Sequence, residues 1–279
     1  MLCLVLAASV SIAEPAPARL QEWTKASAAL MPSQIFIPRA HAASADLRPV
    51  IVFLHGGGDG PFDVMNQQSL PSLLLNNRTF AHHFPFIVLL PCSTCDGGYG
   101  SRGWSSANFD RLEGLLELAL RRFHGDPTRV YLTGQSMGGG GLWSYAGRPN
   151  LFAALVPVCA ASRPSPALVE AACCKQGVAS CCPPVWAFHG ANDQVVPAVF
   201  SDKWVHALRL QTQRKTEVRY TKYADAPPPP MEEFAHLLGH GSYELAYRDP
   251  ELYEWLLTQR CATCRPQPAK PAVESAVEL

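Results

Sequence analysis

A serine between glycines, Ser136, has the surroundings of an activated nucleophile. The segment 134–138 reads GQSMG and follows an apolar, β-branched run at 129–133. Such a segment forms a sharp turn from strand to helix, in which the serine hydroxyl stands above the end of the sheet. Strand and helix approach closely there, so the flanking positions must be small, and Gly134 and Gly138 are. We predict that Ser136 is a nucleophile; a glycine-rich structural turn is the alternative.

A second glycine-rich segment could stabilise the negative charge that nucleophilic attack creates. Residues 55–60 read HGGGDG and directly follow the apolar run 49–54. Backbone N–H groups held in place stabilise such an oxyanion. We predict one donor from Met137 and another from Gly57 or Gly58, while His55 holds the loop. A phosphate-binding loop is the alternative interpretation, but its Gly-Lys-Ser/Thr ending is absent.

An acid that could orient a catalytic histidine follows another strand-like run. Asp193 lies just beyond the apolar run 184–188, which places it at the edge of the sheet where the carboxyl ends of parallel strands meet. Such an acid fixes the histidine tautomer and stabilises the imidazolium. Asp202 and Asp225 are the alternative acids, and neither follows a strand as directly. A solvated turn aspartate is the structural alternative for Asp193.

The base is expected last, since hydrolases with this kind of elbow carry their residues in the order serine, acid, histidine. Two histidines qualify, His236 and His240. His240 lies between two glycines ahead of a predicted helix at 243–259, and a loop residue of this kind can reach the serine. His236 is followed by two leucines and fits a helix face. We therefore favour His240 as the base.

The elements that must position these residues alternate between strands and helices, which is typical of a parallel sheet covered on both faces. The run at 34–38 is predicted to be an early edge strand, and 108–123 has helical periodicity. Two inserts interrupt the frame, at 163–183 and 225–232. The remaining strands are predicted at 49–54, 86–90, 129–133, 153–158, 184–188 and 217–223. One domain accounts for the pattern.

The net charge bears on which molecules the protein could bind, and the amino terminus bears on where it is located. Lys plus Arg and Asp plus Glu are 23 each, so the formal net charge is zero, and no basic surface for nucleic acid or anionic membrane is indicated. Residues 1–13 form an apolar run ending in small residues, which predicts a signal peptide and a secreted or extracytoplasmic protein. A disordered apolar tail is the alternative. No later segment is long and apolar enough to be a membrane span.

The chain has ten cysteines, a number that fits disulfides in an oxidising compartment. Cys159 lies in an apolar run and is predicted to be a buried core thiol. If cleavage removes Cys3, an even set remains whose pairing the sequence leaves open: Cys92, Cys95, Cys173, Cys174, Cys181, Cys182, Cys261 and Cys264. Zinc is the rival interpretation, because 92–95 and 261–264 both have Cys-x-x-Cys spacing.

Three segments resemble one family. Residues 126–139 (DPTRVYLTGQSMGG), 150–154 (NLFAA) and 243–257 (YELAYRDPELYEWLL) are similar to the predicted-peptidase and carboxylesterase group of α/β-hydrolases, which includes groups similar to feruloyl esterases and polyhydroxybutyrate depolymerases. The resemblance covers 33–260. It implies an α/β-hydrolase fold with a mostly parallel central sheet and helices on both faces, secreted esterase activity without a cofactor, and His240 as the histidine ahead of the third segment.

Together these features predict hydrolysis of carboxylic esters, either small or polysaccharide-linked, through Ser136, His240 and Asp193. A serine peptidase of the same fold and a binding protein that has lost catalysis are the alternatives. Tyr99 and Trp104 are candidates for contact with the acyl group, although loop aromatics equally often serve packing. The catalytic domain is expected at 33–260, after a lead-in at 14–32 and before a cysteine-containing, Pro- and Ala-rich tail at 261–279.

Overall fold

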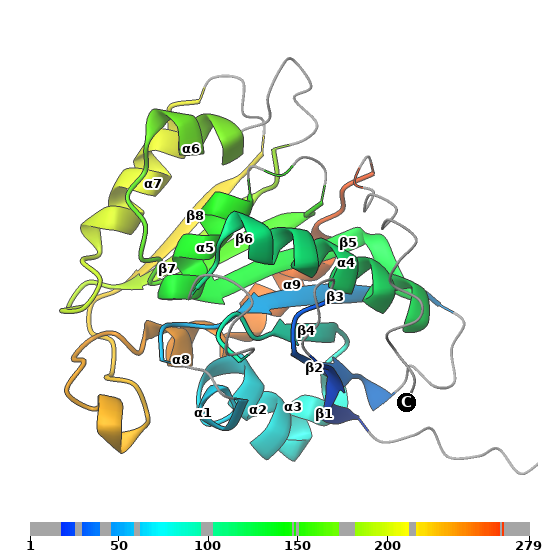
Figure 1. Ribbon diagram of the computed structural model, residues 1–279. Coiled ribbons are helices and arrows are strands. Elements are labelled where there is room, and N and C mark those ends of the chain that lie inside the picture. The colour runs from blue at the N-terminus through cyan, green and yellow to red at the C-terminus, as the bar shows by residue number, and fades with distance from the viewer. Residues whose placement is uncertain are drawn as a thin grey trace, which may run out of the picture.

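A single mixed sheet organises the protein. The computed structural model describes residues 18–25, 30–39, 46–58, 62–95, 103–146, 148, 151–172, 182–211, 216–262 and 264. Within these ranges the sheet has eight strands in the order β1-β2-β4-β3-β5-β6-β7-β8 (Figure 1). The strands are β1 (Arg19–Thr24), β2 (Ser33–Ile37), β3 (Arg48–Leu54), β4 (Ile87–Pro91), β5 (Gly125–Gln135), β6 (Ala154–Val158), β7 (Val185–Gly190) and β8 (Val218–Tyr223).

The sheet is parallel from β4 to β8, and β2 pairs antiparallel with both β1 and β4. Parallel neighbours require crossover connections, and helices supply them. The helices are α1 (Phe62–Met65), α2 (Ser69–Asn76), α3 (Arg78–His83), α4 (Ser106–Arg122), α5 (Met137–Tyr145), α6 (Pro166–Ala172), α7 (Val199–Arg209), α8 (Ser242–Ala246) and α9 (Pro250–Thr258). None in the described ranges is long and apolar enough to span a bilayer.

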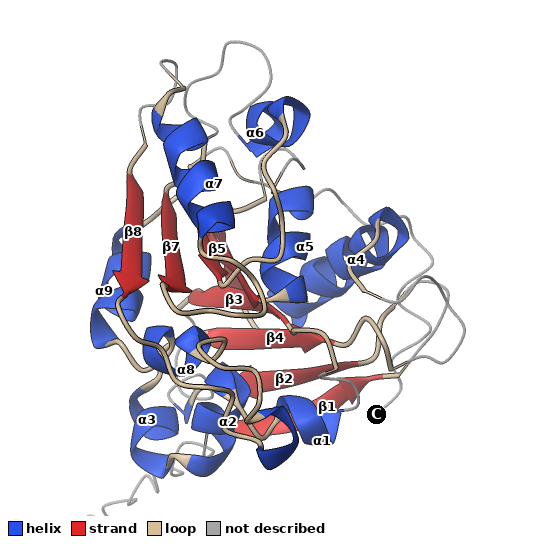
Figure 2. Cartoon of the chain, turned by 90° about the vertical axis from the view of Figure 1, so that its left-hand side faces the viewer, coloured by secondary structure: helices blue, strands red, loops and turns tan. Residues whose placement is uncertain are grey.

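The helices divide between the two faces of the sheet (Figure 2). One core joins α4, α5, α6 and α7 to side chains such as Val52 of β3, and the other joins α2, α3, α8 and α9 to Phe53 of the same strand. Successive side chains of a strand point to opposite faces, so a central strand covered on both sides must be apolar throughout. This explains the unbroken apolar runs that predicted β3, β4 and β6, and it confirms the α/β class.

Two sequence-based assignments were wrong. The run at 34–38 forms β2, which is not an edge strand, because β1 pairs with its outer side. β1 lies in the predicted lead-in and carries polar, partly exposed residues, so its apolar signal is weak. The predicted helix at 243–259 is two helices, α8 and α9. Pro250 disfavours helical backbone at the residue before it, and the Asp249 side chain caps α9 by accepting from Glu251 N at 2.9 Å.

The two Cys-x-x-Cys motifs each close a local disulfide, Cys92–Cys95 and Cys261–Cys264. The expectation of disulfides is confirmed for these four residues, and the zinc interpretation, which needs their four free thiolates, is wrong. Cys159 is fully buried in the core, as predicted. Cys173, Cys174 and Cys181 lie outside the described residues, as do 1–17 and the tail beyond 264.

Candidate active site

The turn between β5 and α5 holds Ser136 in a backbone conformation that side chains rarely adopt, with φ 52° and ψ −116°. Close contact between strand and helix imposes it. A Cβ on Gly138 would collide with the Leu54 carbonyl oxygen, and one on Gly134 would lie 2.6 Å from Gly138 O. The Ser136 N–H donates to Val158 O at 3.0 Å, which ties the turn to β6. The glycines of the GQSMG motif are therefore sterically required, as the sequence predicted.

Three side chains from distant parts of the chain form a line of hydrogen bonds at the carboxyl edge of the sheet. His240 Nε2 lies 2.9 Å from Ser136 Oγ, and His240 Nδ1 lies 2.8 Å from Asp193 Oδ2. A carboxylate oxygen can only accept, so Nδ1 carries a proton and the neutral imidazole accepts the serine hydroxyl proton at Nε2. The imidazole is nearly buried and the Asp193 carboxylate is fully buried. This arrangement can remove a proton from the serine hydroxyl.

Asp193 is held as an anion by several N–H donors. Its Oδ1 accepts from the backbone N–H groups of Val195 and Val196, both at 2.9 Å. Burial by itself raises the pKa of Asp193, but the contact with the His189 N–H, the hydrogen bond and electrostatic attraction of His240, and the Val196 N–H outweigh it and hold the pKa well below its usual value. A carboxyl group in this state is ionised at neutral pH, so it can stabilise an imidazolium.

The alternative acids and base lie apart from Ser136. Asp202 on α7 contacts two residues of β8: it accepts a hydrogen bond from the Tyr220 hydroxyl at 2.9 Å and forms an ion pair with Lys222 at 2.9 Å. Asp225 accepts from the Asn192 side chain at 2.5 Å. His236 is exposed to solvent in the segment before His240. The structure thus brings Ser136, Asp193 and His240 together and leaves the other candidates in surface interactions.

The predicted oxyanion donors lie beside the serine. A Cβ on Gly57 would be 3.9 Å from Met137 Cβ, so the glycine loop and the residue after Ser136 are neighbours. Gly58 has a φ of 84°, a left-handed conformation that glycine adopts without strain. A Cβ there would be 3.5 Å from the Phe234 ring. The two segments that the sequence predicted as oxyanion donors therefore lie next to each other at Ser136.

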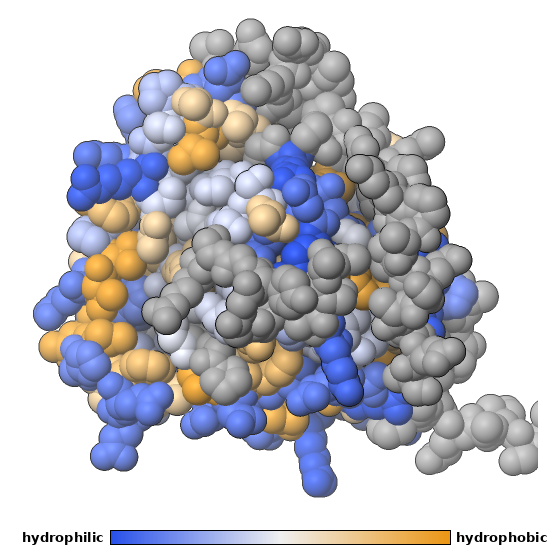
Figure 3. Space-filling model, viewed as in Figure 1, coloured by the Kyte–Doolittle hydropathy of each residue, from blue (hydrophilic) through white to orange (hydrophobic). Residues whose placement is uncertain are grey.

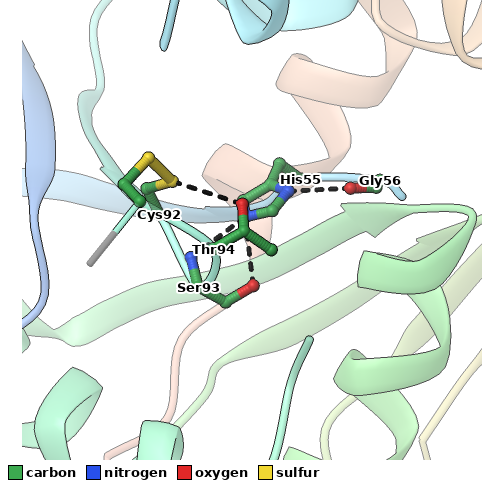
Figure 4. Close-up of a disulfide and its surroundings, with 6 residues drawn as sticks. His55, Gly56, Cys92, Ser93 and Thr94 are labelled. Atoms are coloured by element: carbon green, nitrogen blue, oxygen red, sulfur yellow. Dashed lines mark hydrogen bonds between the residues drawn. A yellow bond between two sulfur atoms is a disulfide. The ribbon is translucent and has the colours of Figure 1, made fainter. Parts of the chain in front are cut away.

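His55 connects this loop to the Cys92–Cys95 disulfide (Figure 4). Its Nδ1–H donates to Gly56 O at 2.8 Å, and its Nε2 accepts from Ser93 N at 3.0 Å. Trp104 adds a further bond, from its indole N–H to His55 O at 3.0 Å. The predicted role of His55 as a loop holder agrees with these contacts, which a neutral imidazole makes.

Protonation of His55 should make the folded protein less stable in mild acid. Burial lowers the pKa of His55 from 6.5 to about 4, although its bond to Gly56 opposes this shift. The unfolded chain binds the proton first, so stability is lost as pH falls from about 6.5 to about 4, on the order of 3 kcal/mol in all. Urea unfolding across this range should be flatter for His55→Gln than for wild type. The exposed His83 provides the control, because His83→Gln should keep the full slope.

Loss of the Cys92–Cys95 disulfide should reduce turnover. Ser93 holds His55 from within this short loop, so a looser loop misplaces the glycines beside Ser136. We expect Cys92→Ala/Cys95→Ala to lower kcat of the hydrolysis predicted from the sequence about tenfold, less than the loss of a whole oxyanion donor would. Cys261→Ala/Cys264→Ala removes the second local disulfide, far from the serine, and should leave kcat unchanged. Equal kcat losses in the two double variants would contradict the link through His55.

A pocket of about 230 Å³ opens onto Ser136 and His240. Its wall is largely apolar and includes Val195, Pro229, Phe234 and Leu237, while Gln68 and Tyr243 add polar atoms. Pro229 comes from the insert at 225–232, which therefore lies at the site. On the face shown in Figure 3, apolar side chains occur in patches between hydrophilic ones.

Of the two predicted aromatic contacts, Trp104 is partly exposed, and its ring packs against His55 with centroids 5.1 Å apart. It is not among the residues that line the described pocket. Tyr99 lies outside the described residues. The sequence did not predict these wall residues, because apolar residues in irregular loops carry no periodic pattern; only the insert at 225–232, which contains Pro229, marked the segment.

Comparisons with known proteins identify solved hydrolases of similar structure. No family model matches the chain, and neither does any curated protein. A thermostable esterase is 26% identical with a TM-score of 0.62, over 87% of this chain and 63% of that one, so the chain spans less than two thirds of its length. An acylaminoacyl peptidase from Pyrococcus horikoshii has the same fold, with 14% sequence identity and a TM-score of 0.58 over 90% of this chain and 43% of that one. A carboxylesterase from Lactobacillus plantarum does too, with 16% identity and a TM-score of 0.50 over 75% of this chain and 84% of that one.

Proposed function

Because the chain is an α/β-hydrolase by its fold and its structural neighbours, we propose that it is a serine hydrolase that cleaves carboxylic esters with Ser136, His240 and Asp193. The observation that carries the proposal is the pair of hydrogen bonds that joins these three side chains. The strained backbone of Ser136 supports it, since strain of this kind persists at sites where function requires the conformation.

The proposed reaction is a two-step acyl transfer. Ser136 Oγ attacks the ester carbonyl carbon while His240 Nε2 takes the hydroxyl proton. The negative charge on the carbonyl oxygen is stabilised by the N–H of Met137 and by that of Gly57 or Gly58. Collapse expels the alcohol, which takes the proton from His240, and leaves an acyl-serine. Water then attacks the acyl carbon while His240 Nε2 takes one of its protons; the bond from that carbon to Ser136 Oγ breaks, His240 returns the proton to Oγ, and the carboxylic acid leaves.

The pocket favours esters over peptides. Its volume of about 230 Å³ is below the range typical of drug-sized ligand sites, and its apolar wall suits the acyl group of a small or polysaccharide-linked ester. A peptidase must also hold a chain on both sides of the scissile bond. A serine peptidase remains the second candidate function, and an inactive binding protein the third.

Covalent labelling tests the proposal. A fluorophosphonate should label the wild-type protein at Ser136 and should not label Ser136→Ala, while Ser72→Ala on α2 should label like wild type. Acetate, butyrate and feruloyl esters assayed beside peptide anilides should show Ser136-dependent hydrolysis of esters at a kcat/KM well above that of the peptides. Absence of labelling would support the binding protein, and faster peptide cleavage would support the peptidase.

We also propose that the protein acts outside the cytoplasm. The two disulfides support this location, because disulfides persist in oxidising compartments. The predicted signal peptide at 1–13 lies outside the described residues. Fractionation of cells that express the full chain should recover the ester hydrolase activity outside the cytoplasm.

A further inference from the structure

One buried histidine at the site takes no part in the proton transfers above. His189 lies on β7, four residues before Asp193, and its side chain has no exposed surface. Its Nε2 lies 2.8 Å from Val196 O and 3.3 Å from Asp193 Oδ2, and its Nδ1 lies 2.7 Å from Ser201 Oγ. His189 therefore joins α7 to the turn that carries the acid.

The contacts determine which nitrogen of His189 carries a proton. A carbonyl oxygen and a carboxylate oxygen face Nε2, and both only accept, so Nε2 carries a hydrogen. Its direct bond is the shorter one to Val196 O, and the contact with Asp193 Oδ2 is a longer electrostatic one. The Ser201 hydroxyl faces Nδ1 and can donate to it. The orientation of the ring is thus fixed from both sides.

We propose that His189 is a positioning residue for Asp193, an inference that rests on the proposed serine hydrolase function. It acts in two ways. Its hydrogen bond to Val196 O stabilises the turn in which the N–H groups of Val195 and Val196 donate to Asp193 Oδ1. The partial positive charge of its N–H also stabilises the negative charge on Oδ2, the same oxygen that accepts a hydrogen bond from His240. Oδ2 is therefore held between two imidazole rings.

This arrangement affects both the geometry and the basicity of the line of hydrogen bonds. A carboxylate held at both oxygens cannot rotate away when His240 turns toward the leaving group, so the proton path stays aligned. The His189 N–H also reduces the negative charge available to His240. Without it, Asp193 would hold the imidazolium form of His240 more strongly.

Two other ionisable side chains of the described residues lie near Asp193 and His240. The Cys159 sulfur lies within 4.8 Å of the ligand atoms of Asp193 and His240, from the end of β6. The Tyr243 ring of α8 lies 6.4 Å from the His240 ring, edge to face. Neither changes in the variants below, so a shift in the pH profile can be attributed to position 189.

The experiment compares His189→Phe, which keeps an aromatic ring but has no N–H, with His189→Gln, which can present an N–H near the same place. We expect His189→Phe to lower kcat for a short-chain ester about 10- to 100-fold with little change in KM, and to move the acid limb of the kcat/KM profile upward by about half a pH unit. His189→Gln should recover much of both. Tyr131→Phe, which removes a buried hydroxyl bond to Gln259 O away from the serine, is the control and should match wild type.

The outcomes separate this inference from the proposed function. A wild-type protein without Ser136-dependent hydrolysis overturns the proposed function, whereas an active wild type with an unchanged acid limb and kcat in His189→Phe overturns the role of His189. If His189→Phe does not fold, Ser201→Ala decides: it removes the hydroxyl that faces His189 Nδ1 and should lose part of kcat without a change in KM, and wild-type kcat there would refute the role.

Discussion

Ser136→Ala and Ser136→Gly should be equally inactive, with kcat for esters lowered by at least ~10⁴-fold, yet the glycine variant should be the more stable of the two by about 1 kcal/mol. Both lack the hydroxyl and its bond to His240. Only glycine adopts the φ of 52° without strain, and the strain at such a residue costs ~1–3 kcal/mol, part of which the greater chain entropy of unfolded glycine cancels.

Ser72, inside α2, provides the matched control, because its backbone is helical. There alanine should be more stable than glycine by about 1 kcal/mol, the reverse order. Urea unfolding of the four variants and of wild type measures both differences. If Ser136→Gly proves less stable than Ser136→Ala, the turn does not store strain at the serine.

Asp193→Asn should lower kcat by about 10³- to 10⁴-fold while the protein stays folded. The backbone N–H groups of Val195 and Val196 face Oδ1, so the amide oxygen takes that place and the amide N–H₂ takes the place of Oδ2. The N–H₂ group then donates to His240 Nδ1. His240 must carry its proton on Nε2 instead, where it can no longer accept from Ser136.

The same variant should change the acid stability of the protein. The pKa of Asp193 is held below its usual value in the folded state, so its stabilising contribution is complete above the pKa of the unfolded aspartate, about 3.9, and is lost as pH falls toward the folded pKa. The unfolding free energy of Asp193→Asn should therefore fall less steeply below about pH 4 than that of wild type.

Asp202→Asn is the control for kcat. It changes an exposed ion pair and should keep wild-type kcat. A loss of kcat in Asp202→Asn comparable to that in Asp193→Asn would contradict a specific role for Asp193.

The central strands, the turn at Ser136 and the glycine loop could be predicted from the types of neighbouring residues. Apolar runs buried on both faces predicted the central strands, and the small residues around Ser136 predicted the turn, because a Cβ at 134 or 138 collides with neighbouring backbone. The glycines at 56–58 predicted a loop beside the serine for another reason, because backbone N–H groups there could stabilise an oxyanion. These features depend on backbone sterics within a few residues and on burial, both of which can be inferred from residue types.

The features that depend on contacts between distant segments could be seen only in the tertiary structure. Asp193 and His240 were favoured among several candidates from their places in the sequence, and the structure showed how the ends of β7 and of the segment before α8 bring their side chains to Ser136 at the end of β5. β1, the pairing of the Cys-x-x-Cys motifs within themselves, and the hold of His189 on the acid also emerged only from the structure. Such contacts follow from the sheet order and the paths of irregular loops, which leave no periodic signal in the sequence.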